Sequence, residues 1–70
     1  MVLFYAVAIA GVAIIGGAVI HRVVSAVVKA DSPESAVDKV QAAFEYEIED
    51  EGYDPSLFEF LSHVTEVKDA

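Results

Sequence analysis

The chain has 70 residues and a mass of 7.5 kDa, which limits it to one small domain. It is 56% hydrophobic, yet its formal net charge is −8. The absence of cysteine excludes disulfides, thiolate metal sites and a thiol nucleophile. The negative charge argues against a nucleic-acid partner, because the chain would repel a phosphate backbone.

The charge and the apolar residues lie in different parts of the chain. Residues 1–30 carry Arg22 and Lys29 and no acid, whereas residues 31–70 carry all twelve acids against Lys39 and Lys68. The first part therefore contributes +2 and the second −10. This division predicts an all-α protein with a single N-terminal transmembrane helix over 1–30 and an acidic helix-turn-helix arm over 31–70, its helices at about 33–50 and 55–67.

The transmembrane prediction depends on the first apolar run. From Val2 to Ile20 there is no charged residue, and about 19 helical residues span roughly 28 Å, close to the thickness of a bilayer's hydrocarbon core. The side chains expected to anchor this helix at the membrane interfaces are Tyr5, His21, Arg22 and Lys29. A cleaved signal peptide and a buried helix of a soluble protein are the alternatives, and the length of the run favours a retained span.

Small residues recur along the same run at helical spacing. Ala6, Ala10, Ala13 and Gly17 follow one another at intervals of four, three and four residues. In a helix they would share one face, and small residues let membrane helices approach closely. We therefore expect this stripe to pack against other transmembrane helices or copies of itself.

The acidic part contains two helix starts. Asp31 or Ser32 can cap a first helix with Pro33 at its first position, and Gly52 can end it in the left-handed conformation. Asp54-Pro55 repeats the start for a second helix. The apolar residues expected to pack the two helices together are Val37, Val40, Phe44, Ile48, Leu57, Phe58, Leu61 and Val64.

The acids before Gly52 are the main candidate for ligand chemistry. Glu47, Glu49 and Glu51 match positions 1, 3 and 5 of a calcium loop, but Phe58 stands where that loop needs a bidentate carboxylate. A solvated acidic face is the preferred interpretation, and it suits either a basic partner or a high-salt environment. No serine has a base placed near it in the sequence, so we expect no enzyme activity, cofactor, metal or small-molecule substrate.

Together these features predict a structural subunit of a larger assembly. Because Arg22 and Lys29 follow the apolar run, the N-terminus is expected outside and the acidic arm on the cytoplasmic side. The expected partners are the lipid bilayer, other transmembrane helices or copies of the chain, and a protein layer that contacts the arm. A membrane-containing virion, in which the chain links bilayer to shell, is preferred; the alternative is an accessory subunit or small regulatory peptide of a cellular membrane complex.

Overall fold

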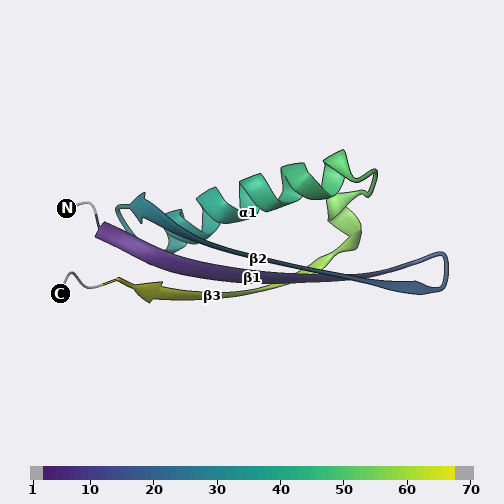
Figure 1. The fold of residues 1–70 in the computed structure, drawn as a ribbon, viewed down its shortest axis with the longest axis horizontal. Coiled ribbons are helices and arrows are strands. Elements are labelled where there is room, and N and C mark those ends of the chain that lie inside the picture. Colours follow the sequence, from purple (N-terminus) through teal and green to yellow (C-terminus); the bar gives the residue numbers. More distant parts are fainter. Residues whose placement is uncertain (1–2, 68–70) are drawn as a thin grey trace.

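The computed structural model describes residues 3–67 and shows a three-stranded antiparallel sheet with one long helix on one face (Figure 1). The elements in chain order are β1 (Leu3–Ile15), β2 (Ala18–Ala30), α1 (Pro33–Asp50), the short 3-10 helix η1 (Pro55–Leu57) and β3 (Glu59–Glu66). The strand order is β2-β1-β3, so β1 lies in the centre. The predicted all-α fold is therefore wrong.

The residues expected to form a transmembrane helix form the β1–β2 hairpin instead. Within residues 3–67 no helix is long and apolar enough to cross a membrane. The predicted single-pass localisation, with the N-terminus outside and the acidic arm in the cytoplasm, is wrong for the same reason.

The hairpin is set by a glycine pair at its turn. Gly16 and Gly17 have φ values of 59° and 82°, and they separate the paired residues Ile15 and Ala18. Positive φ at both central residues is the requirement of a type I′ turn, the favoured two-residue connection between twisted antiparallel strands. Valine and isoleucine on either side favour strand over helix because their branched side chains restrict χ1. Figure 1 shows this turn projecting beyond the end of α1.

Helix α1 lies in the range expected for the first helix of the arm. The Ser32 hydroxyl accepts a hydrogen bond from the Ser35 N–H at 3.1 Å, and Pro33 occupies the first helical position. At the other end Gly52 has φ 94°, and the Tyr53 N–H donates to the Ile48 carbonyl at 3.1 Å. The Gly52 N–H also donates to the Glu49 carbonyl at 2.9 Å, and the two bonds form a Schellman cap, which satisfies the last carbonyls of the helix.

The second predicted helix, over 55–67, is a strand. Asp54 caps only the single turn η1, and Glu59–Glu66 then pairs antiparallel with β1 from Tyr5↔Glu66 to Val12↔Glu59. Phe60 and Val64 are four residues apart, so in a strand both lie on the helix side, where they pack against the core. The pairing places the chain beside a long apolar strand, and this tertiary context overrides the helix-start signal at Asp54-Pro55.

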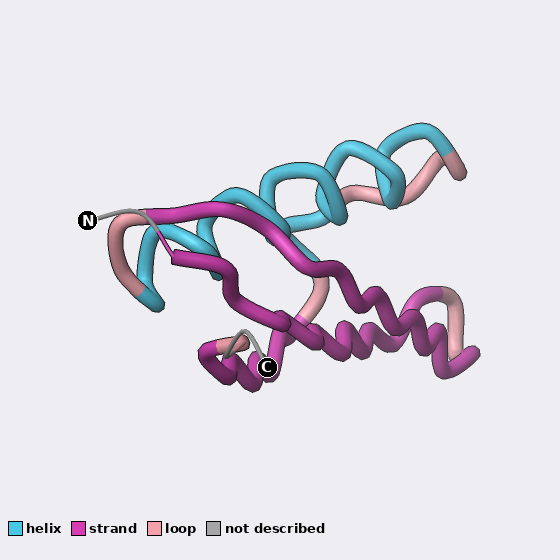
Figure 2. Tube along the Cα trace, turned by 60° about the vertical axis from the view of Figure 1, so that its left-hand side comes forward, coloured by secondary structure: helices cyan, strands magenta, loops and turns pink. Residues whose placement is uncertain are grey.

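The core lies between α1 and the sheet (Figure 2). Its buried residues are Tyr5, Val7, Ile9 and Ala13 of β1, Ala30 of β2, Ala36, Val40, Phe44 and Ile48 of α1, and Phe58. At one end Phe44 meets Phe60 edge to face, with ring centroids 5.6 Å apart, and Phe58 stacks on Phe60 at 6.1 Å. Gly11 leaves room for these rings, since a Cβ there would lie 3.0 Å from Phe60 Cε1.

Candidate functional site

The face of the sheet that turns away from α1 is the candidate site, and we call it the open face. Alternation along the strands and the strand register place alternate residues there. Its members are Phe4, Ala6, Ala8, Ala10, Val12 and Ile14 of β1, Val19, His21, Val23, Ser25, Val27 and Lys29 of β2, and Glu59, Leu61, His63 and Thr65 of β3. Several large apolar side chains on this face are mostly exposed, including Leu61 at 79%, Ile14 at 75% and Val23 at 62%.

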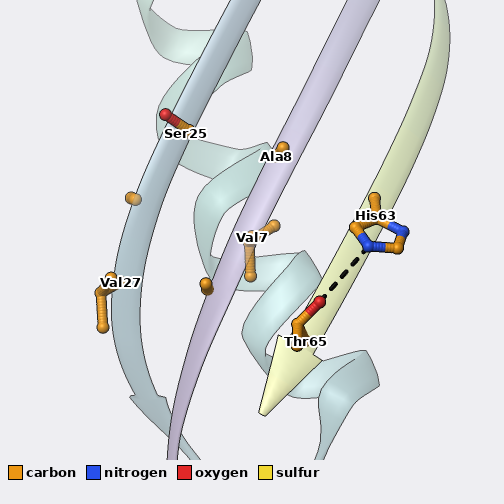
Figure 3. Close-up of a pocket in the computed structure, with 8 residues that line it drawn as sticks. Val7, Ala8, Ser25, Val27, His63 and Thr65 are labelled. Atoms are coloured by element: carbon orange, nitrogen blue, oxygen red, sulfur yellow. Dashed lines mark hydrogen bonds between the residues drawn. The ribbon is translucent and has the colours of Figure 1, made fainter. Parts of the chain in front are cut away.

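The open face has a groove along its centre. Ala6, Ala8 and Ala10 form its floor, because the central strand carries only small side chains over this stretch. Larger side chains from both outer strands form its walls, among them Val23, Val27, Leu61 and His63. Two hollows of about 360 and 430 Å³ lie along the groove, and Ala8 and His63 line both of them. Figure 3 shows the first hollow with α1 behind the strands.

Charge is divided between the two sides of the molecule. Among the described acids, only Glu59 lies on the open face, while the others occupy α1, the loops at its ends and the helix side of β3. The basic residue on this face is Lys29, whose Nζ lies 5.4 Å from the Phe4 ring centroid. One side of the molecule is therefore acidic and the other is apolar and nearly neutral.

The polar side chains on the groove walls do not form a catalytic pair. His63 Nε2 and Thr65 Oγ1 are hydrogen-bonded to each other at 3.3 Å (Figure 3). Ser25 pairs with Ala8 from one side and His63 pairs with Ala8 from the other. Adjacent strands lie about 4.8 Å apart, so Ser25 and His63 are separated by roughly twice that distance. No proton can pass directly between them.

An ion pair joins β2 to the end of α1. Arg22 Nη2 donates to Glu51 Oε1 at 2.9 Å and Arg22 Nε donates to the same oxygen at 3.1 Å. The hydrogen bond from Arg22 lowers the pKa of Glu51, and the hydrogen bond to Glu51 raises the pKa of Arg22. Both side chains are well exposed, at 38% and 43%, so the pair positions the helix end more than it stabilises the fold.

A second carboxylate, that of Asp54, accepts hydrogen bonds within its own turn. Its carboxylate accepts hydrogen bonds from the Ser56 hydroxyl at 2.8 Å and the Ser56 N–H at 2.9 Å. These bonds lower the pKa of Asp54. The ionised carboxylate thereby fixes the turn that leads from α1 into β3.

The small residues expected to share a helix stripe are dispersed by the hairpin. Ala6 and Ala10 lie on the open face and form part of the groove floor. Ala13 is buried on the opposite face, and Gly17 lies in the turn. A helical period places these residues together, whereas the period of two in a strand separates them.

The expected interface anchors are also in different environments. Tyr5 is buried in the core at 5% exposure, Arg22 is bound to Glu51, and His21 and Lys29 lie on the open face. None of the four is at the end of a membrane helix.

The three glutamates considered as candidate calcium ligands do not converge. Glu47 and Glu49 lie in the last turns of α1, and Glu51 at the helix cap binds Arg22. In residues 3–67 no group of three or more His, Cys, Asp or Glu side chains could hold a metal ion.

The residues expected to pack the arm divide between two surfaces. Val40, Phe44, Ile48 and Phe58 are buried in the core, and Val37 and Val64 pack against it. Leu57 is 55% exposed in η1, and Leu61 stands on the open face. The open face is absent from the predictions made from the sequence, although Gly16-Gly17 between two β-branched runs is a signal for the hairpin.

Comparison of the chain with protein-family models, characterised proteins and solved structures found no match.

Proposed function

We propose that this protein is a structural subunit that assembles with copies of itself through the open face of its sheet. The observation that carries the proposal is the apolar character of that face. An antiparallel sheet with one face in water normally carries polar residues there. Here Val23, Val27 and Leu61 occupy outward positions in its middle. Apolar side chains gain roughly 25 cal/mol for each Å² removed from water, so covering this face is favourable.

The distribution of charge favours a second copy as the partner that covers the open face. Two molecules packed open face to open face carry their acidic helices on opposite outer surfaces. Stacked sheets lie about 10 Å apart, and the helices lie beyond them. That separation exceeds the Debye length of about 8 Å at physiological ionic strength, so the charge of −8 on each copy opposes this contact only weakly.

The shape of the open face also favours a second copy of the protein as its partner. Leu61, at 79% exposure, stands beside a groove whose floor is only Ala6, Ala8 and Ala10. In a two-fold arrangement the protruding Leu61 of each copy enters the alanine groove of the other. The acidic surface of α1 remains free, and it is available to the protein layer that the charge of the chain leads us to expect.

Light scattering after size-exclusion chromatography tests the proposal. Leu61→Asp places a charge in the centre of the open face, and Tyr46→Asp is the matched control, because Tyr46 is 74% exposed on α1. We expect Leu61→Asp to halve the mass measured for the wild type at the same concentration and Tyr46→Asp to leave it unchanged. Circular dichroism verifies that both variants keep the fold.

Two results would contradict the proposal. One is a wild-type mass equal to that of Leu61→Asp at every concentration tested. The other is a monomeric wild type that co-floats with phosphatidylcholine vesicles while Leu61→Asp does not, because that result would assign the open face to lipid.

A further inference from the structure

A second contact surface lies on the outer edge of β2, and it is independent of the open face. Strand β2 is 13 residues long and lies at the edge of the sheet. Long edge strands without guarding charges pair readily with another strand. Arg22 and Lys29 are the charged residues of β2, and the stretch between them is uncharged.

The turn determines which backbone groups of β2 are free. A two-residue turn makes its flanking residues, Ile15 and Ala18, a hydrogen-bonded pair. Every second residue of β2 from Ala18 onward therefore bonds to β1. The residues between them direct their N–H and C=O groups away from the sheet.

Two side chains of the same molecule cover both ends of this free edge. Arg22 Nη1 donates to the carbonyl of His21 at 2.9 Å, and Lys39 Nζ donates to the carbonyl of Lys29 at 2.7 Å. Both acceptors are residues whose carbonyls point outward, as the register requires. Within residues 3–67, no such bond covers the outward groups of Val23, Ser25 and Val27.

We propose that this exposed stretch pairs antiparallel with the same stretch of a second copy, with Ser25 opposite Ser25. In that register Val23 lies opposite the second copy's Val27, and each of these pairs exchanges two backbone hydrogen bonds. On the helix side Val24 lies opposite the second copy's Ala26. The residues between Arg22 and Lys29 are all uncharged, so no like charges meet within the paired stretch. The stretch is thus complementary to itself, and this favours a second copy over an unrelated strand.

The pairing joins two sheets into one. Its two-fold axis is perpendicular to the sheet, so the open faces of both copies lie on the same side and form one continuous surface. Cross-strand pairs of β-branched residues, such as Val23 with Val27, stabilise such a junction. Where the two-fold axes of the face and edge contacts intersect, the two contacts together close into an assembly of four copies.

Cysteine cross-linking tests the register, because the chain contains no cysteine of its own. Hydrogen-bonded residues have Cα atoms about 5.5 Å apart, within the range that a disulfide spans. We expect Ser25→Cys to oxidise to a covalent dimer, and Val19→Cys, on the same strand and face, to form no disulfide-linked dimer on a non-reducing denaturing gel. Val23→Cys and Val27→Cys should cross-link in a mixture but not separately. Equal cross-linking of Val19→Cys and Ser25→Cys, or of the separate and mixed proteins, would overturn the register.

A proline substitution at Ser25 provides an independent test of the edge pairing. Ser25→Pro removes an N–H that points outward, so the β1–β2 ladder is retained. We expect the mass of Ser25→Pro and of Leu61→Asp each to be half that of the wild type, and the double variant to be monomeric. If Ser25→Pro keeps the wild-type mass while Leu61→Asp halves it, the edge inference is wrong and the open-face proposal stands. The reverse result would contradict the open-face proposal alone.

Discussion

The guanidinium of Arg22 in β2 holds the carboxylate of Glu51 at the end of α1, with Nη2 and Oε1 2.9 Å apart. The same guanidinium donates through Nη1 to the carbonyl of its neighbour His21. One side chain thus connects the helix to the sheet and covers one end of the free edge of β2. The pair joins residues 29 positions apart in the sequence.

The first prediction concerns the pH dependence of this ion pair. Hydrogen bonding lowers the folded-state pKa of Glu51 below its ordinary value of 4.5. The pair therefore stabilises the fold fully above pH 4.5, and its contribution is lost as the pH falls through the folded-state pKa. We expect Glu51→Gln to lower Tm slightly at pH 7 and to have a smaller effect at pH 3. Glu47→Gln is the control. An equal fall in Tm for both variants at pH 7 would argue against a stabilising contribution from the Arg22–Glu51 ion pair.

The second prediction concerns the space left by Gly11. A Cβ at this position would lie 3.0 Å from Phe60 Cε1 and 3.4 Å from Phe44 Cε2. We expect Gly11→Ala to destabilise the protein by about 1–3 kcal/mol in urea unfolding, the typical cost of overpacking. Phe60→Leu removes the closest ring, so the double variant should lose less than the sum of the two single losses. Additive losses would show that contact with the Phe60 ring is not the reason why Gly11→Ala destabilises the protein.

The third prediction separates a hairpin from a helix at Gly17. Its φ of 82° suits glycine, and no atom within 4 Å would contact a Cβ, so any cost of a substitution is conformational. We expect Gly17→Ala to destabilise the fold by about 1–2 kcal/mol, because an L-residue is strained in this region. In a helix the same change would stabilise by about 1 kcal/mol. Gly16→Asn is the control, since asparagine is accepted at the first position of a type I′ turn.

The fourth prediction concerns salt. In the edge-paired dimer both acidic helices lie on the same side of one sheet, so their like charges oppose association. Raising the ionic strength shortens the Debye length from about 10 Å at 0.1 M to about 3 Å at 1 M. We expect the dissociation constant of the Leu61→Asp protein, which retains only the edge contact, to fall as sodium chloride is added. A rise in that constant with salt would contradict the proposed arrangement of the helices.

The sequence predicts α1 well because each of its signals is local. Ser32, Pro33 and Gly52 act within one turn of the helix ends, and Val40, Phe44 and Ile48 repeat at the helical period. The hairpin is harder to predict. Both faces of β1 and β2 are apolar, so the period of two that marks a strand is absent from the sequence. The lack of charge from Val2 to Ile20 then suggests a membrane span.

The open face could not be predicted for a related reason. It combines residues of three strands, and Leu61 lies beside Ala10 only through the register of β3 against β1. Residues 55–67 have the capping signals of a helix, and these signals do account for η1. They fail after Leu57 because pairing with β1 depends on a partner more than 40 positions earlier in the chain.

The most direct test of the open-face contact is an isotope-filtered NOE measurement on a mixture of labelled and unlabelled protein. We expect intermolecular cross-peaks between the Leu61 methyl groups of one copy and the Ala8 or Ala10 methyl groups of the other. Using Ser25→Pro protein confines the signal to the face contact. Intramolecular cross-peaks alone, at a concentration where light scattering shows a dimer, would contradict the open-face contact.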